Sequence, residues 1–354
     1  MKHKKLMITL MVFLSLVFIW VIMIVFPTGK VLGKDSTNPF LKTSELPIIA
    51  AHRGGRYMSP ENTIAAFNNF NRLYIATNRS DEKRMLETDL RMTKDQTLVL
   101  MHDSSVDRTS DIDLVISDFP DEMKGVVKSS NGKYEVSSLT LDQLNHLNFA
   151  YKFQDSEGKT PYSANLDNKT WEERGKLLST NGQYYTYSIC SLDEFFNQYH
   201  SYSQIIYSVE IKDSDELGKK AVDQLVKKMK EYEVTDRVVV GTFHDEISSY
   251  LEENYPNVMM GASTGVAAKF LVTTLLGVNV FMKPKFCCLQ IPTSYGGINI
   301  TLQSLYNRAH KRGISVQIWT INEVEDMKKL IKMDVDVIMT DKPDVLFNLY
   351  ETDY

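Results

Sequence analysis

Two histidines, His52 and His102, each stand at the end of an apolar run that is typical of a buried strand. Imidazole titrates near neutral pH, so two histidines in one site can serve as acid and base, or as nucleophile. Arg53 follows the first histidine and offers a guanidinium fork that suits phosphate oxygens, although an ion pair with Glu61 is a structural alternative. The two glycines after Arg53 allow a tight turn with close backbone approach.

Carboxylates recur at the ends of two other runs. Glu87 and Asp89 are two residues apart on a strand and therefore project from the same face, where they repel each other unless a cation lies between them. Ca²⁺ or Mg²⁺ would be a natural partner, because both prefer oxygen ligands. Glu210 and Lys212 repeat this spacing. Glu210 can add a third carboxylate and Lys212 can neutralise a phosphate oxygen, or the two can form an ion pair with each other.

Three residues near the C-terminus also lie at or just after strand ends. Trp319 suits the wall of a pocket or the core equally well, and Asn322 could contact a substrate. Asp341 is as well suited to capping a helix N-terminus as to a site.

The elements that carry these residues alternate between strand-like and helix-like patterns, which predicts a parallel sheet with covering helices. We expect an α/β fold, a TIM (β/α)8 barrel with an insertion after the third strand and an N-terminal transmembrane helix. Barrel active sites lie at the C-terminal ends of the strands, where these residues fall, although an open doubly wound sheet places ligands there too.

The pattern contains nine strand candidates, whereas a closed barrel has eight places. The weakest is Val258–Gly261, and no helix separates the second candidate from the third. The candidates are Pro47–His52, Met85–Met92, Leu98–Asp103, Ile205–Lys212, Val238–Phe243, Val258–Gly261, Phe286–Ile291, Val316–Ile321 and Val335–Asp341. The helical patterns are Asn62–Tyr74, Glu216–Glu231, Asp245–Glu253, Leu302–Lys311 and Glu323–Lys332.

Two segments depart from the alternation. Residues 111–188 are polar and aromatic and contain one recognisable helix, Leu141–Leu147. So long an insertion is usually functional, the alternative being a surface elaboration with no catalytic role. The apolar stretch Val266–Phe281 predicts a helix against the barrel, or a surface that touches lipid.

The N-terminus carries an uncharged apolar run of 21 residues, Leu6–Phe26, which is long enough to span a bilayer. The lysines ahead of it favour a cytoplasmic N-terminus and a catalytic domain outside the cell. We expect an uncleaved anchor with its flank at 1–34, a linker at 35–46 and a catalytic domain at 47–350. A cleaved signal peptide, and hence a secreted protein, is the alternative.

Composition excludes other classes. The chain of 354 residues has a formal net charge of −5 and no basic stripe, so nucleic acid is not an expected partner. The three cysteines, Cys190, Cys287 and Cys288, are expected to be small buried residues of the core.

Taken in order, the motifs resemble the glycerophosphodiester phosphodiesterase family over about residues 47 to 350. They are His52-Arg53-Gly54, Pro60-Glu61-Asn62-Thr63, Glu87-x-Asp89, His102-Asp103, Asp107-Arg108-Thr109, Glu210-x-Lys212, Trp319-Thr320-x-Asn322 and Thr340-Asp341-x-Pro343. The resemblance implies a TIM barrel that hydrolyses glycerophosphodiesters to glycerol 3-phosphate and an alcohol with one divalent metal ion, Ca²⁺ or Mg²⁺. There are two departures. Ser110-Asp111-Ile112-Asp113 stands where the family usually has a small glycine-containing turn, and the stretch after Val238–Phe243 lacks strong family markers.

The resemblance also implies roles for individual residues. The metal ligands would be Glu87, Asp89 and Glu210, the acid/base pair His52 and His102, the substrate-binding residues Arg53, Lys212 and Trp319, and the supporting residues Glu61 and Asn322. The substrate would be a small or lipid-derived glycerophosphodiester. Alternatives are cleavage of lysophospholipid or sphingolipid head groups, a cyclising lyase on the same barrel, and an inactive binding module.

Overall fold

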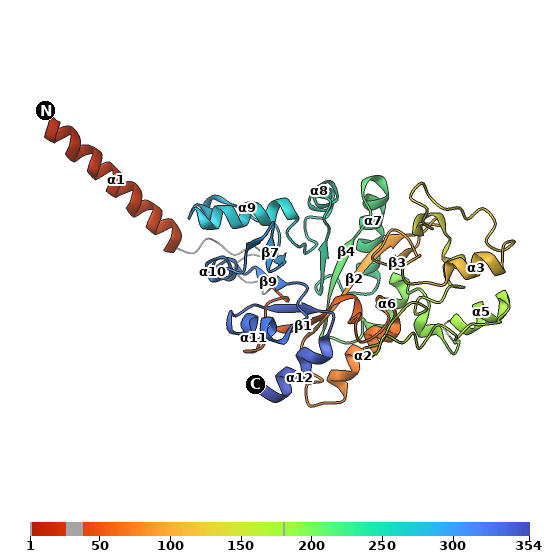
Figure 1. The fold of residues 1–354 in the computed structure, drawn as a ribbon. Coiled ribbons are helices and arrows are strands. Elements are labelled where there is room, and N and C mark those ends of the chain that lie inside the picture. Colours follow the sequence, from red (N-terminus) through yellow and green to blue (C-terminus); the bar gives the residue numbers. More distant parts are fainter. Residues whose placement is uncertain (1, 26–37, 180) are drawn as a thin grey trace.

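Seven parallel strands form a nearly closed barrel at the centre of the computed structural model, which describes residues 2–25, 38–179 and 181–354. The strand order around the barrel is β5-β4-β2-β1-β10-β9-β6. The TIM-barrel prediction is thus confirmed, and Figure 1 shows helices around the outside. The barrel strands are β1 Ile48–Ala51, β2 Arg84–Met92, β4 Ile205–Ile211, β5 Val238–Gly241, β6 Cys288–Ile291, β9 Ser315–Ile318 and β10 Val337–Thr340.

The place between β5 and β6 is filled by the weakest strand candidate. Met260 makes a parallel bridge to Val240, and Gly261 makes one to Cys288, so two residues connect the edge strands without forming a full strand. The excess candidate is β3, Leu98–Leu100, which runs antiparallel to β2 and lies outside the barrel path.

The helices that follow the strands confirm the predicted helical patterns with shifted ends. Apolar side chains on their inner faces meet the apolar outer faces of the strands. In this layer Phe67 and Phe195 contact each other, and both meet the ring of Tyr199 edge-to-face. The helices are α2 Ile64–Ile75, α6 Leu192–Tyr199, α7 Asp215–Glu231, α8 Asp245–Asn254, α10 Gln303–Lys311, α11 Val324–Lys332 and α12 Pro343–Asp353. Of these, α6 and α12 were not among the predicted helical patterns.

The barrel interior has its own apolar cluster, closed at one end by the chain that precedes β1. Phe40 is fully buried, and the Asn38 side-chain amide donates to the carbonyl oxygens of Cys287 and Gly313 at 2.7 and 2.9 Å. The described part of the predicted linker, from Asn38 onward, is therefore held against the barrel. Cys190, Cys287 and Cys288 are buried free thiols, as expected.

The insertion between β3 and β4 has a separate small core. Its helices are α3 Ile112–Asp118, α4 Leu141–Leu144 and α5 Trp171–Leu178, with single 3₁₀ turns η2 Val136–Ser138 and η3 Tyr185–Tyr187. The expected helix Leu141–Leu147 is only one turn long. A capping box between Thr140 and Gln143 begins it, and the chain turns after Asn145 so that Leu147 enters the insertion core.

The apolar stretch Val266–Phe281 was expected to be one helix. The prediction is wrong for the last six residues, which lie beyond the end of helix α9, Thr264–Leu275. The helix stops before Gly277, whose φ of +71° is the left-handed conformation that ends many helices. A 3₁₀ turn, η4 Asn279–Phe281, follows. Downstream, the strands β7 Ser294–Tyr295 and β8 Ile298–Asn299 form a hairpin through two glycines.

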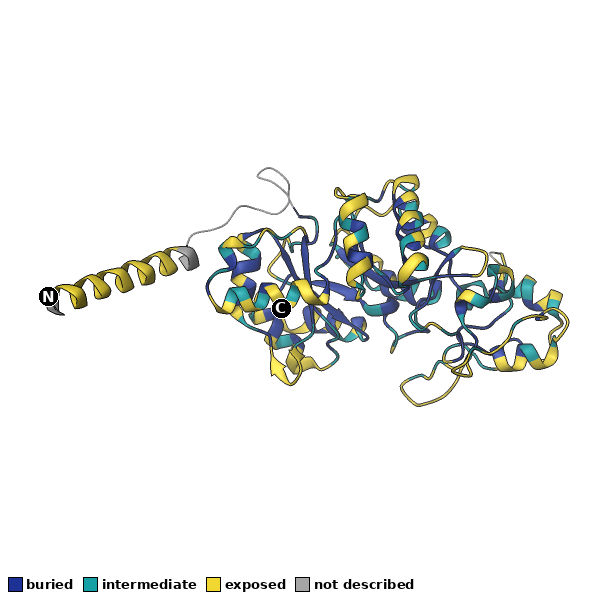
Figure 2. Ribbon diagram, turned by 90° about the horizontal axis from the view of Figure 1, so that it is seen from above, coloured by how far each residue is buried: buried dark blue, intermediate teal, exposed yellow. Residues whose placement is uncertain are grey.

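The N-terminal helix α1, Lys2–Val25, projects away from the barrel (Figure 1). Its described side chains are exposed, as Figure 2 shows, and it is long and apolar enough to cross a membrane. The last residue of the predicted span, Phe26, the flank 27–34 and the start of the linker, 35–37, lie outside the described residues.

Candidate active site

The chain leaves β1 through a turn that places His52 and Arg53 at the end of the barrel where the strands finish. Arg53 has φ +53° and ψ +32°, a left-handed conformation that costs about 1–3 kcal/mol in a residue other than glycine. Its N–H donates to Oε2 of Glu87 at 2.7 Å, which compensates part of this cost. Gly54 follows with φ +83°, and a Cβ there would lie 2.6 Å from Cβ of Ala66 on α2.

Each histidine is paired with a carboxylate through its Nδ1 atom. Nδ1 of His52 lies 2.6 Å from Oδ1 of Asp341, and Nδ1 of His102 lies 2.7 Å from Oδ1 of Asp103. This pairing fixes each ring and leaves Nε2 available for a ligand. Burial alone would lower the pKa of His52, but the hydrogen bond to Asp341 and the charge of Glu87 outweigh it, so the pKa is raised.

Asp341 is held in place by other groups. Nδ2 of Asn322 donates to it at 2.8 Å, Nε of Arg56 lies 2.9 Å away, and its own N–H donates to Oδ1 of Asn322. Burial raises the pKa of Asp341, but its bond to His52 prevails and the pKa is lowered, so it stays ionised. Lys342, and not Asp341, occupies the N-cap position of helix α12, and the Asp341 carboxylate contacts His52. Both the amide nitrogen and the amide oxygen of Asn322 are therefore bonded to Asp341.

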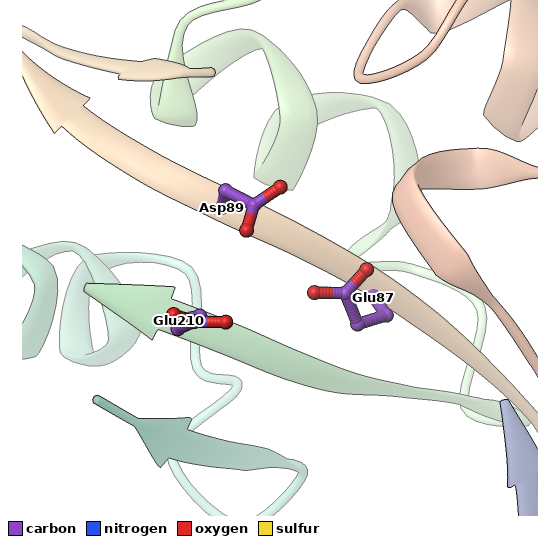
Figure 3. A group of neighbouring side chains, drawn as sticks. All are labelled: Glu87, Asp89 and Glu210. Atoms are coloured by element: carbon purple, nitrogen blue, oxygen red, sulfur yellow. The ribbon is translucent and has the colours of Figure 1, made fainter. Parts of the chain in front are cut away.

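Three carboxylates gather on neighbouring strands. Glu87 and Asp89 project from β2 and Glu210 from β4, with one oxygen of each within 4.8 Å of the others (Figure 3). Burial and the charge of Asp89 raise the pKa of Glu87 to about 7 and also raise the pKa of Glu210. Negative charge is thus only partly compensated here, and an all-oxygen donor set of this kind fits a hard divalent cation.

Two cationic side chains border this cluster. Nζ of Lys212 lies 2.7 Å from Oε1 of Glu210 and 3.6 Å from Asp89, and Nε of Arg53 lies 3.4 Å from Asp89. Burial would raise the pKa of Asp89, but these two charges lower it. Arg53 also donates to Glu61 at 3.2 Å. The ion pairs Arg53–Glu61 and Lys212–Glu210, which the sequence offered as alternatives to phosphate binding, are thus both formed, and Arg53 and Lys212 still line the cavity.

Glu61 belongs to a network that connects the two histidine-bearing turns. Arg108 donates to Glu61 and to Asp103, both at 2.6 Å, so a chain of ionic contacts runs from His102 through these groups to Arg53. Asn62 donates to Asp89 at 3.1 Å, and Thr63 caps α2. The Pro-Glu-Asn-Thr and Asp-Arg-Thr motifs therefore contact Arg53, Asp89 and Asp103 and hold these side chains in place.

The two histidines, the carboxylate cluster and the two cations line one cavity of about 350 Å³. Every residue predicted to be catalytic, metal-binding or substrate-binding lines it: His52, Arg53, Glu87, Asp89, His102, Glu210, Lys212 and Trp319. The two supporting residues, Glu61 and Asn322, do not line it. No described residue of the 111–188 insertion lines it either.

Sequence reasoning did not assign four residues of this site. Asp103 and Asp341 orient the histidines, and both stand at strand ends, a signal that was available. Ser208 and Gln290 are polar residues within barrel strands that line the cavity and hydrogen-bond to each other at 2.9 Å. The opposite wall is apolar and comes from α9 and the β7–β8 hairpin.

An α/β barrel whose strand ends carry two histidines, two cations and clustered carboxylates is an enzyme architecture suited to phosphoryl chemistry. The family model of the glycerophosphoryl diester phosphodiesterase family matches residues 52–345. The chain belongs to this family.

Individual relatives agree with the family match. The chain is 26% identical over 304 residues to a glycerophosphodiester phosphodiesterase of Caldanaerobacter subterraneus, covering 85% of this chain and 97% of that protein. It is 22% identical over 301 residues to one of Bacillus altitudinis, covering 84% and 95%.

Solved structures share the fold. The glycerophosphoryl diester phosphodiesterase domain of a Mycobacterium tuberculosis protein has a TM-score of 0.61 at 15% identity, covering 86% of this chain and 99% of that domain. A phosphodiesterase of Oleispira antarctica, solved with the product sn-glycerol-3-phosphate, has a TM-score of 0.57 at 18% identity, covering 87% and 98%.

Proposed function

We propose that this protein hydrolyses glycerophosphodiesters to glycerol 3-phosphate and an alcohol, with one divalent metal ion and with His52 and His102 as acid and base. The observation that carries the proposal is the pairing of both histidines with carboxylates at a cavity that also holds three clustered carboxylates and two cations. The product in the Oleispira antarctica structure agrees with the reaction proposed here.

Arg53 and Lys212 bind the phosphate oxygens of the substrate in this proposal. Both cations are already held at the cavity by carboxylates, so little side-chain freedom is lost when the substrate binds. Trp319, which packs edge-to-face on Phe243, forms the wall beside them.

Glu87, Asp89 and Glu210 are the proposed ligands of the metal ion, Ca²⁺ or Mg²⁺. Bound there, it would stabilise the negative charge that grows on the phosphate oxygens. A cation bound between Glu87, Asp89 and Glu210 would also lower the electrostatic cost of burying the three carboxylates together.

Proton transfer is assigned to Nε2 of the two histidines. One accepts the proton of the attacking oxygen and the other donates a proton to the departing alkoxide. The attacking group is water, or the glycerol 2-hydroxyl followed by hydrolysis of a cyclic phosphate. Phosphorus NMR of the products distinguishes the two routes, because a persistent cyclic phosphate identifies a cyclising lyase.

The test compares His52→Ala, His102→Ala and the double variant in glycerol 3-phosphate release from glycerophosphocholine. Because the two histidines act in one step, each single variant should lose about 10²–10⁴-fold in kcat, and the double variant should lose little more. A folded single variant with wild-type kcat would contradict the two-histidine assignment.

We further propose that α1 is an uncleaved anchor within 1–34, with a linker at 35–46 and the catalytic domain at 47–350 outside the cell. Its length and its apolar, exposed surface support this. Mass spectrometry of the mature protein from the membrane fraction tests it. A chain that starts after residue 26 would instead indicate a cleaved signal peptide and a secreted enzyme.

A further inference from the structure

Large apolar side chains are exposed around one side of the cavity mouth. We call this set the apolar rim. Its residues, each between 52% and 74% exposed, are Val272, Leu275 and Leu276 of and after α9, Phe281 of η4, and Tyr295 and Ile298 of the β7–β8 hairpin. Both α9 and the hairpin also line the cavity, so the rim borders its opening. An exposed patch of this kind is typical of a surface that binds a partner.

The apolar rim continues into the cavity along α9. Residues four apart on a helix lie one above the other on the same face. Two such rows run from the cavity wall to the rim without a charged residue, namely Thr264–Ala268–Val272–Leu276 and Ala267–Leu271–Leu275. A hydrocarbon chain can therefore lie against one continuous apolar surface from the rim to the site.

The charge of this region restricts what the rim can bind. The chain has 45 acidic residues, yet none lies in the 68 residues from Tyr255 to Asn322, which include α9, η4 and the hairpin. Lysines are present, and Lys269 and Lys283 are exposed beside the rim. In space, Asp245 lies beside Gly265 at the N-terminal end of α9, and Glu252 is paired with Lys285. An apolar surface that has lysines beside it and no acidic residue of its own fits a lipid bilayer with anionic head groups.

The apolar rim also lies next to the helix that is long enough to span a membrane. Nε1 of Trp20 in α1 donates to the carbonyl oxygen of Leu276 at 2.9 Å, and α1 lies against η4. Tryptophan is enriched at the level of lipid head groups, so this contact sets the rim at the height where the span leaves the bilayer.

We propose that the apolar rim inserts into the bilayer that α1 spans, and that the cavity takes single-chain glycerophospholipids from that bilayer. The phosphodiester lies at Arg53 and Lys212, and the hydrocarbon chain lies against the two rows of α9. Water adds across the bond between phosphorus and the head-group oxygen. Its hydroxyl goes to phosphorus and its proton to the alkoxide, which gives acylglycerol 3-phosphate and the free alcohol. The inference rests on the proposed phosphodiesterase activity.

The first test uses the full chain in anionic vesicles with two substrates that release choline, lysophosphatidylcholine and soluble glycerophosphocholine. Phe281→Glu should lower kcat/KM for the lysolipid roughly tenfold, as expected when an apolar side chain is withdrawn from lipid, and leave glycerophosphocholine unaffected. The matched control is Leu114→Glu, an exposed leucine of the insertion, which should change neither.

The outcomes distinguish failure of the lipid inference from failure of the proposed phosphodiesterase activity. Equal loss on both substrates, no loss on either, or no hydrolysis of lysolipid by an enzyme that cleaves glycerophosphocholine would overturn the inference alone. A wild-type enzyme that cleaves neither substrate would overturn the proposed function as well.

The second test measures insertion directly. Phe281→Cys is labelled with an environment-sensitive fluorophore, since the three native thiols are buried. Brominated lipids should quench this label and should not quench one at Val127→Cys, which is 68% exposed in the insertion. Equal quenching at both positions, or none at Phe281→Cys, would show that the rim does not enter the bilayer.

Discussion

Replacing Asp341 by asparagine tests the pairing that holds His52. The substitution keeps the size of the side chain but removes the charge that accepts from Nδ1 of His52 at 2.6 Å. An asparagine amide facing Nδ1 would favour the opposite ring tautomer, so neutral His52 would carry its proton on Nε2 and could not accept one there. Arg56 would also lose a partner 2.9 Å away.

The expected loss follows from the contacts. A hydrogen bond to a charged group is worth about 1.5–3 kcal/mol, which corresponds to roughly 10–150-fold in rate. Loss of all proton transfer by one histidine sets an upper limit of about 10⁴-fold. Because Asp341 raises the pKa of His52, its removal lowers that pKa, so the limb of the pH profile that belongs to His52 moves to lower pH.

The assay is kcat for glycerol 3-phosphate release from glycerophosphocholine, measured across the pH range in which histidines titrate. The chain offers a matched control in His310, whose Nε2 lies 2.8 Å from Asp336 outside the cavity. Asp336→Asn should leave both kcat and the pH profile unchanged in the folded enzyme. A folded Asp341→Asn enzyme with wild-type kcat and an unmoved limb would refute the reasoning.

Three further outcomes are expected. Glu87→Gln removes a charge from the carboxylate cluster, so calorimetry should show affinity for Ca²⁺ or Mg²⁺ lowered by more than about tenfold, with activity falling in parallel. Burial would lower the pKa of His310, but Asp336 outweighs it and raises the pKa above 6.5. The stabilisation is therefore complete below pH 6.5 and is lost as the pH rises through the raised value, so urea unfolding of wild type and His310→Gln should converge at high pH. Gly54→Ala brings a Cβ within 2.6 Å of another Cβ, so it should lower the free energy of unfolding by about 1–3 kcal/mol more than Gly125→Ala.

Each of these outcomes has a control and a contrary result. Glu246→Gln, an exposed glutamate of α8, should bind metal as wild type does, and an unchanged affinity in Glu87→Gln would remove it from the ligand set. A stability difference for His310→Gln that grows with pH would reverse the stated sign. Gly125 has the same φ of +83° as Gly54 but open space around it, so equal losses would mean that strain alone, not the contact, decides the cost.

Much of the site could be predicted because it depends on local rules. A spacing of two on a strand puts Glu87 and Asp89 on one face whatever the rest of the fold does, and parallel strands bring their C-terminal ends together. His52 and His102 were found because each follows an apolar run.

The remainder depends on long-range partners that no local pattern contains. The eighth place of the barrel is filled by two bridges at Met260 and Gly261, too few for a strand signal. Asp341 reaches His52 across 289 residues of chain, and a strand-end aspartate before a proline looks equally like a helix cap. The apolar wall of the cavity comes from α9 and a hairpin, whose pairing with the site depends on closure of the barrel.

Metal-dependent hydrolysis of a glycerophosphodiester at the cavity is tested most directly by one measurement. Purified full-length protein is incubated with glycerophosphocholine in Ca²⁺, in Mg²⁺ and in chelator, and glycerol 3-phosphate is quantified. We expect release with at least one of the two ions, none in chelator, and recovery when that ion is restored. Undiminished release in chelator, or no glycerol 3-phosphate with either ion, would contradict it.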